Sequence, residues 1–215
     1  MYELGGAFSE DVVAPGTNLL VAGAPMTGKR ALALDVLARG SADGEGALVV
    51  TTKDSAERVL ADFRSLPEVT ADARVGVVDC VSRQQGVRTA SDDEFVRFAS
   101  SPNDLTGIGI ELSELLQTFY RDDNRRNRVL LHSLSTLLMY ADLQTVFRFL
   151  HVFTGRVQSV EALGLFVIDS TAHDAQTLST IKQLFDGVVE VETTDDARRA
   201  RLLGVPDVDG DWRTF

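Results

Sequence analysis

The chain has 215 residues, of which 44% are apolar and 25% are charged, and its formal net charge is −11 at pH 7. This composition excludes a disordered chain, which would lack the apolar residues for a core, and a disulfide scaffold, because Cys80 is the only cysteine. No apolar run approaches the roughly 20 residues that span a bilayer, and the N-terminus lacks the order of a signal peptide. We therefore expect a cytoplasmic protein with no membrane segment, folded as one domain over residues 1–215.

Short apolar runs alternate with segments of helical period, which is typical of an α/β fold with a parallel sheet covered by helices. In chain order we expect an irregular N-terminus up to Gly16, a strand over 18–22, a loop over 23–28, a helix over 29–39, a strand over 47–51, a helix over 55–65 with Ser55 as its N-cap, and a strand over 74–79. Next come a polar loop over 82–103 around a short helix at 92–99, a helix over 108–122, a strand over 128–133, a helix over 142–160, a strand over 163–168, a helix over 175–185, a strand over 188–192 and a terminal hairpin around 207–210.

The charged residues are biased in type. Only three of the 21 basic residues are lysine, and Asp outnumbers Glu by 21 to 11. An Asp-rich, Lys-poor surface stays hydrated where salt screens charge over about 3 Å at 1 M, which favours a salt-loving source, with codon bias as the alternative. The acidic surface makes nucleic acid a poor partner. Two short basic clusters are interleaved with Asp, and we interpret them as solvated faces or subunit contacts: Arg121, Arg125, Arg126 and Arg128, and Arg198, Arg199 and Arg201.

One motif carries a specific mechanism. It consists of Gly23, Ala24, Pro25, Met26, Thr27, Gly28, Lys29 and Arg30. The spacing satisfies G-x-x-x-x-G-K, but Arg30 stands where a phosphate-binding loop has Ser or Thr. A buried strand leads in and a helix leads out, so backbone N–H groups can form an anion nest while Lys29 reaches a terminal phosphate. The alternative is a glycine-rich turn that binds no phosphate.

Five segments follow one another along the chain: 15–29 (PGTNLLVAGAPMTGK), 47–57 (ALVVTTKDSAE), 75–79 (VGVVD), 129–135 (VLLHSLS) and 185–191 (FDGVVEV). In these segments the chain resembles the RecA-like ATPase domains of the KaiC and archaeal RadA group, and 129–135 looks like the Walker B strand. The resemblance implies a single RecA-like P-loop domain with a mostly parallel sheet, flanking helices and a C-terminal β-hairpin. Short archaeal members, including transducer-like (HTR-like) proteins of halophiles, would share the charge pattern.

The resemblance fails at the positions that do chemistry. In the family, Mg²⁺ is held by a P-loop hydroxyl and the Walker B Asp, and these positions are Arg30 and His132 here. The family's water-activating Glu falls at Lys53, with Asp54 beside it, and a protonated lysine cannot act as a general base. The hairpin's Lys/Arg pair has no clean counterpart, because the run 202–205 (LLGV) crosses that region. We therefore expect neither a catalytic residue nor a metal site.

These losses lead to two hypotheses. In the first, the protein is a non-catalytic, regulatory or signalling member of this group that binds partner proteins and ATP or another nucleotide, without Mg²⁺ if Arg30 offsets the phosphate charge. Alternatively, Arg30 is a surface residue on the first helical turn and points away from the loop. In the second hypothesis, the protein is a weak ATPase that completes its site within a homo-oligomer. Recombinase-like DNA binding is disfavoured by the charge.

Two further residues need an interpretation. His132 lies at a strand end within an apolar run, and we interpret it as a hydrogen-bonded, half-buried histidine with no catalytic role. Asp169 and Ser170 follow the strand at 163–168 and superficially copy a Walker B ending. Because the order of the flanking elements places Walker B at 128–133, we interpret Asp169 as a loop cap.

Overall fold

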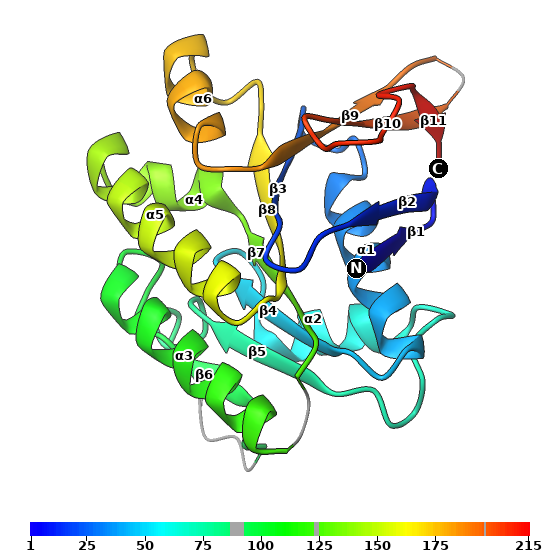
Figure 1. Cartoon of the computed structure of the whole chain (residues 1–215). Helices are drawn as coiled ribbons and strands as arrows, with labels where there is room; N and C mark the ends of the chain where they lie inside the picture. The colour runs from blue at the N-terminus through cyan, green and yellow to red at the C-terminus, as the bar shows by residue number, and fades with distance from the viewer. Residues whose placement is uncertain (87–92, 123–124, 196) are drawn as a thin grey trace.

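The computed structural model describes residues 1–86, 93–122, 125–195 and 197–215 (Figure 1). Its elements are β1 (Tyr2–Gly5), β2 (Phe8–Val13), β3 (Asn18–Gly23), α1 (Lys29–Ala42), β4 (Gly46–Thr51), α2 (Ala56–Arg64), β5 (Val75–Asp79), β6 (Val96–Phe98), α3 (Leu105–Arg121), β7 (Asn127–His132), α4 (Leu134–Tyr140), α5 (Leu143–Ser159), β8 (Leu163–Asp169), α6 (Ala175–Lys182), β9 (Gly187–Thr193), β10 (Arg198–Leu203) and β11 (Arg213–Thr214). The expected α/β class is confirmed.

A nine-stranded sheet forms the centre of the molecule, in the order β11-β10-β9-β3-β8-β7-β4-β5-β6. The strands from β9 to β6 are parallel, whereas β10 and β11 are antiparallel to their neighbours. Strands β3, β4 and β7 are buried along their whole length, which explains their unbroken apolar runs. The carboxyl ends of these strands lie at one edge of the sheet, where β3 leads into the loop before α1.

Helices cover both faces of the sheet and create two hydrophobic cores. On one face, α1, α2 and the β1–β2 hairpin contribute to the first core. On the other, α3, α4, α5 and α6 contribute to the second (Figure 1). The helix starts follow the local sequence: Ser55 caps α2 by accepting the N–H of Arg58, as expected, and Asp104, Asp142 and Asp174 cap α3, α5 and α6 in the same way.

The N-terminus is a β-hairpin, so the expectation of an irregular segment up to Gly16 is wrong. Its inward residues alternate along β1 and β2, and four of them have side chains that are 1% exposed: Tyr2, Leu4, Phe8 and Val13. The turn uses two glycines with positive φ, Gly5 at 70° and Gly6 at 52°. The hairpin is therefore part of the first core, packed against α1 (Figure 1).

Arg128 corrects the interpretation of the first basic cluster as a solvated face. Its side chain is 1% exposed, and its Nε donates to the buried carboxylate of Glu45 at 2.6 Å. The same guanidinium donates to the carbonyl of Val36 at 2.6 Å and to that of Glu3 at 2.8 Å. Because its charge is paired and hydrogen-bonded, the arginine can lie under the N-terminal hairpin without an isolated buried charge.

Three other expectations change. The helix expected over 92–99 is wrong, because the described part, from Asp93 onward, contains the strand β6 at the sheet edge; residue 92 lies outside the described residues. Helix α4 follows β7 directly, where none was expected. Strand β10 was also missed, although the terminal hairpin is confirmed, since β10 and β11 pair on either side of residues 207–210. The remaining strands and helices agree within a few residues.

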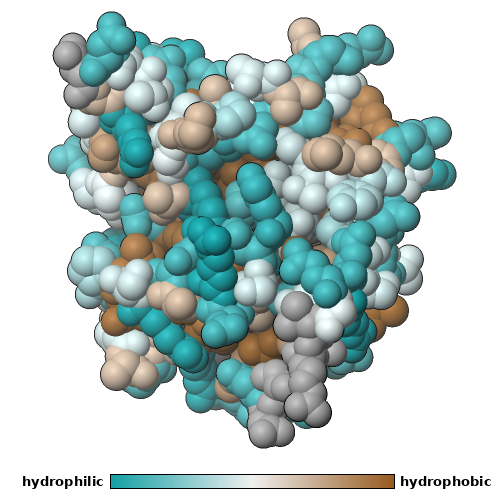
Figure 2. All heavy atoms as spheres, turned by 180° about the vertical axis from the view of Figure 1, so that it is seen from behind, coloured by the Kyte–Doolittle hydropathy of each residue, from teal (hydrophilic) through white to brown (hydrophobic). Residues whose placement is uncertain are grey.

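The surface and the helices add two observations. Among the described residues, no helix has both the length and the apolar character required to traverse a bilayer. Seen from behind the view of Figure 1, hydrophilic residues occupy much of the surface, with hydrophobic residues between them (Figure 2).

Candidate phosphate-binding site

The loop between β3 and α1 has the backbone of an anion nest. Gly28 has φ 87° and stands as the N-cap of α1, without a side chain to accept the first-turn N–H groups. Met26 has φ 64°, and its side chain is 92% exposed. Gly23 must be glycine, because a Cβ there would lie 2.4 Å from the carbonyl oxygen of Val191. The first-turn donors of α1 therefore remain for an anion at the positive end of the helix.

Lys29 lies inside this loop. It is 7% exposed, and its Nζ donates to the carbonyl of Ala24 at 2.9 Å. The same atom forms an ion pair with Oδ1 of Asp169 at 2.5 Å. Asp169 ends β8, and the parallel pairing of β3 with β8 places it beside Gly23. The interpretation of Asp169 as a loop cap is therefore wrong, since its carboxylate faces the lysine of the loop.

Arg30 points toward the end of β4 and the start of α2. Its Nε lies 3.4 Å from a carboxylate oxygen of Asp54, and a terminal nitrogen lies 2.8 Å from one of Asp62. Its side chain is 28% exposed. The structure therefore brings Arg30 and Asp54 together. Both ion-pair partners of Arg30 lie outside the loop, at the end of β4 and in α2, so the alternative of an arginine that points away from the loop stays open. Asp62 had no sequence signal, because its role depends on how α2 packs beside α1.

His132 ends β7, level with Thr51 of β4 and Val167 of β8. Its side chain is 8% exposed, which is more buried than expected. Burial, and after it the positive charge of Arg30, lower the pKa of its imidazole to about 4. His132 is therefore neutral at pH 7. Lys53 is exposed at the neighbouring strand end and also lowers the pKa of His132.

The residues at this edge do not fit a Mg²⁺ ion. The carboxylates of Asp54 and Asp169 are each paired with a cation, Arg30 and Lys29 respectively. A guanidinium and a neutral imidazole, at Arg30 and His132, are not the oxygen ligands that Mg²⁺ prefers. In the part of the chain that the structure describes, no cluster of three or more His, Cys, Asp or Glu side chains could hold a metal ion.

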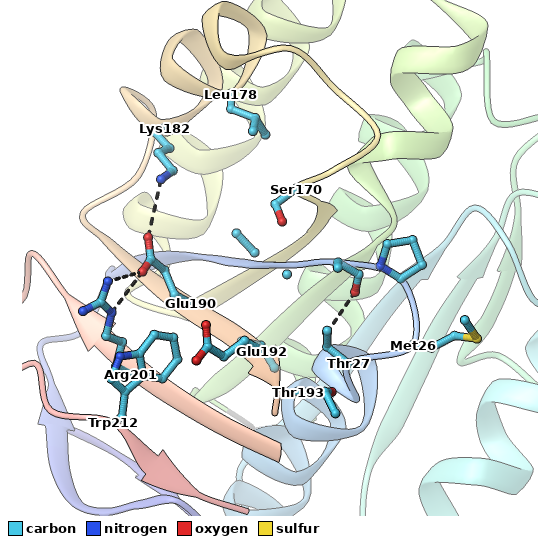
Figure 3. A pocket seen from close by; sticks show the side chains of 15 residues that line it. Met26, Thr27, Ser170, Leu178, Lys182, Glu190, Glu192, Thr193, Arg201 and Trp212 are labelled. Atoms are coloured by element: carbon cyan, nitrogen blue, oxygen red, sulfur yellow. Dashed lines mark hydrogen bonds and ion pairs between the residues drawn. The ribbon is translucent and has the colours of Figure 1, made fainter. Parts of the chain in front are cut away.

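A cavity of about 630 Å³ opens on the other side of the loop, toward β9 and α6 (Figure 3). The segment from Gly23 to Thr27 forms one wall. Glu190 and Glu192 of β9 and Trp212 form the opposite wall, and Leu178 of α6 points toward the cavity from above. Its volume lies within the usual range for small-molecule sites, about 300–1,000 Å³. Trp212 was not singled out from the sequence, because nothing in its local pattern places it near the loop.

Fold and loop together define the class of protein. A mostly parallel sheet with helices on both faces, a G-x-x-x-x-G-K loop between β3 and α1, and a C-terminal antiparallel hairpin describe a RecA-like P-loop fold of the KaiC-like type. Residues 16–191 match the family of unknown function DUF7504, and the chain belongs to that family.

Two solved structures, PH0186 from Pyrococcus horikoshii OT3 and PH0321 from Pyrococcus horikoshii, show the same fold. The KaiC-like protein PH0186 is 12% identical, with a TM-score of 0.59, and the alignment covers 93% of this chain and 83% of that one. The uncharacterized protein PH0321, solved in complex with an unknown peptide, is 10% identical, with a TM-score of 0.68 and coverage of 94% and 88%. No curated protein matches the chain.

Proposed function

We propose that this protein binds a nucleotide through residues 23–30 without hydrolysing it, and that it acts as a regulatory protein toward a partner protein. The observation that carries the proposal is the pairing of Arg30 with Asp54 and Asp62. This guanidinium lies at the edge of the sheet where a hydrolytic relative would need metal ligands and a general base. In this proposal the loop and Lys29 attract the phosphate, while Arg30 and His132 stand where cleavage would need metal ligands.

Phosphate binding would use the loop itself. The N–H groups at the start of α1 have no side-chain cap, and the helix end carries about half a positive charge. Lys29 already holds an anion, the carboxylate of Asp169 at 2.5 Å, and a phosphate oxygen would compete for the same ammonium. Arg30 would supply a second fixed positive charge where other nucleotide sites use a metal.

Hydrolysis would lack its main contributors. Phosphoryl transfer depends on positioning and on stabilisation of developing charge, and one preorganised contact of this kind is worth about 3–4 kcal/mol. Neutral His132 cannot replace a metal-binding carboxylate, and position 53 carries a lysine where the family's general base is a carboxylate. The loss of both functions should make turnover negligible.

The partner-binding half of the proposal has separate support. PH0321, which shares the fold at 10% identity, was solved in complex with an unknown peptide. We infer that a fold of this kind can present a peptide-binding surface, and that this chain uses one to act on a partner.

Calorimetric titration of ATP in high salt tests the nucleotide site. We expect equal affinity with EDTA and with Mg²⁺, because the chain itself supplies the cations. Lys29→Ala should weaken binding about 10- to 100-fold, since a charge-assisted hydrogen bond is lost. Lys53→Ala is the matched control, an exposed lysine at the same edge, and should change affinity little. A strict Mg²⁺ requirement would contradict the proposal. Phosphate release that disappears in Lys29→Ala would instead indicate a weak ATPase.

Arg30 can be tested separately from Lys29. Arg30→Ala should weaken ATP binding in EDTA by about 10-fold or more, because a fixed charge near the phosphate is removed. Arg58→Ala is the control, since Arg58 also pairs with Asp54, at 3.6 Å, but its side chain is 71% exposed on α2. Equal effects of the two variants would show that Arg30 acts only through Asp54.

A further inference from the structure

Trp212 is the only tryptophan in the chain, and it lines the same cavity as the phosphate-binding loop (Figure 3). The guanidinium carbons of Arg199 and Arg201 lie 4.9 and 4.6 Å from its ring centroid. These cation–π contacts hold the indole against β10. An aromatic ring fixed beside a cavity is a surface on which another flat ring can stack.

The two arginines are themselves fixed by the neighbouring strand. In the antiparallel register of β9 and β10, Arg199 lies opposite Glu192 and Arg201 opposite Glu190. Arg199 Nε donates to Glu192 at 2.5 Å, and Arg201 donates twice to one oxygen of Glu190, at 2.7 and 3.0 Å. This ladder places the indole and both carboxylates on one wall of the cavity, with the phosphate-binding loop as the other wall (Figure 3).

Arg201 and Lys182 also line the cavity, but both are paired with Glu190, so a phosphate group alone would engage mainly the loop wall. The opposite wall offers an aromatic ring and two carboxylates, and Leu178 adds apolar surface to the lining. Ionised carboxylates accept hydrogen bonds and do not donate them. A flat heterocycle with an exocyclic amino group matches this wall, because its ring can stack and its N–H groups can reach Glu190 or Glu192.

We propose that the cavity binds the base of a nucleotide, stacked on Trp212, and that the site prefers bases with an amino group. This inference rests on the proposed function, because the phosphates of the same nucleotide would lie in the loop at residues 23–30. Trp212 then determines selectivity for a nucleotide over inorganic polyphosphate, whereas Lys29 determines binding of the phosphates.

The tryptophan itself reports the binding. Intrinsic fluorescence of the unchanged protein should be quenched by ATP and left unchanged by inorganic triphosphate, because only ATP carries a base that reaches the indole. Calorimetry should give tighter binding for ATP than for triphosphate, and tighter binding for ATP than for ITP, which has a carbonyl in place of the amino group. Equal affinity for ATP and ITP would overturn the preference for an amino group.

Substitution of Trp212 separates base binding from phosphate binding. Trp212→Ala should weaken ATP binding about 5- to 100-fold, the range typical of a lost base–aromatic stack, and leave triphosphate affinity unchanged. Trp212→Phe should retain most of the affinity. Tyr120→Ala is the matched control: like Trp212, Tyr120 has an arginine over its ring, at 5.4 Å, but Tyr120 is exposed and does not line this cavity.

The outcomes distinguish the two proposals. If triphosphate binds as tightly as ATP and the fluorescence does not change, the stacking inference is overturned while the phosphate site stands. If neither ligand binds, the proposed function fails and the stacking inference fails with it. The fluorescence measurement uses the unchanged protein, so it decides the matter even if Trp212→Ala does not fold.

Discussion

The two basic residues that end the phosphate-binding motif, Lys29 and Arg30, each face a carboxylate from another part of the chain. Lys29 pairs with Asp169 of β8, and Arg30 pairs with Asp54 and with Asp62 of α2. His132, buried beside them, avoids a charge altogether because burial and Arg30 lower its pKa to about 4. This arrangement fits the proposed exchange of these carboxylates for a bound anion at Lys29 and Arg30, and His132 adds no charge near neutral pH.

The lowered pKa of His132 predicts a pH dependence of stability. Between about pH 6.5 and pH 4 the unfolded chain binds a proton on this histidine and the folded chain does not, so the free energy of unfolding should fall as the pH falls through this window. Across this window the free energy of unfolding should fall by on the order of 3 kcal/mol in total, and above about pH 6.5 His132 should cause no such loss. Urea denaturation at several pH values gives the free energy of unfolding as a function of pH. Its slope against pH between pH 4 and pH 6.5 should be shallower for His132→Gln than for the unchanged protein.

His151→Gln is the matched control for this prediction. His151 is exposed on α5, and its substitution should leave the slope between pH 4 and pH 6.5 as it is. Equal slopes for the unchanged protein and His132→Gln would mean that His132 takes up its proton in the folded state as readily as in the unfolded chain.

At the scale of elements, the two ends of the chain are joined to each other. Arg213 of β11 pairs with the buried carboxylate of Asp11 in β2 at 2.5 Å, and its guanidinium lies 5.9 Å from the ring centroid of Phe8. In the other strand of the hairpin, β1, the ring centroid of Tyr2 lies 4.5 Å from the guanidinium of Arg126. The β1–β2 hairpin is thus an integral part of the fold, packed between α1 and the C-terminal strands.

The hairpin's contribution to stability can be measured with two substitutions in β2. Phe8→Ala should lower the free energy of unfolding by about 3–5 kcal/mol, because the ring is 1% exposed and its removal leaves a cavity. Val12→Ala, at a side chain that is 43% exposed in the same strand, should change it by no more than about 0.5 kcal/mol. Chemical denaturation that gives similar values for both variants would contradict the packing of β2 against α1.

At the scale of the whole molecule, the net charge of −11 opposes the compact state. Arginine–carboxylate pairs on several elements, such as Arg39 with Glu3 and Arg74 with Asp122, offset part of the repulsion. Such exposed pairs are individually weak, with a typical worth of about 0–1 kcal/mol. Added salt would screen the remaining repulsion between acidic groups.

We accordingly expect the free energy of unfolding to rise with salt. Between 0.05 M and about 1 M KCl the screening length shortens to about 3 Å, and stability at pH 7 should increase by on the order of 1 kcal/mol or more. The control is the same titration near the isoelectric point of about 4.7, where the net charge vanishes and the salt dependence should become small. Stability that is constant or falls with KCl at pH 7 would contradict the interpretation of the charge bias.

Local sequence was sufficient wherever a feature depends on neighbouring residues. The central strands are predictable because burial on both faces requires unbroken apolar runs, and α2 is predictable because Ser55 caps it. The phosphate-binding loop is predictable because strand, glycines, lysine and helix follow one another within one short segment. The short edge strand β6 was mistaken for a helix because its conformation is fixed by pairing with β5, which no local pattern encodes.

The sequence by itself determined the fold class and the position of the loop, and it predicted which residues stand at the positions of the family's catalytic ones. Only the tertiary structure decided what those residues face. Strand β8 lies between β3 and β7, and this order brings Asp169 to Lys29. The packing of α2 gives Arg30 its second carboxylate, and the chain beyond β10 carries Trp212 to the cavity. Contacts between distant segments depend on strand order and helix packing, and hydrophobic periodicity specifies which residues are buried but not which neighbours they meet.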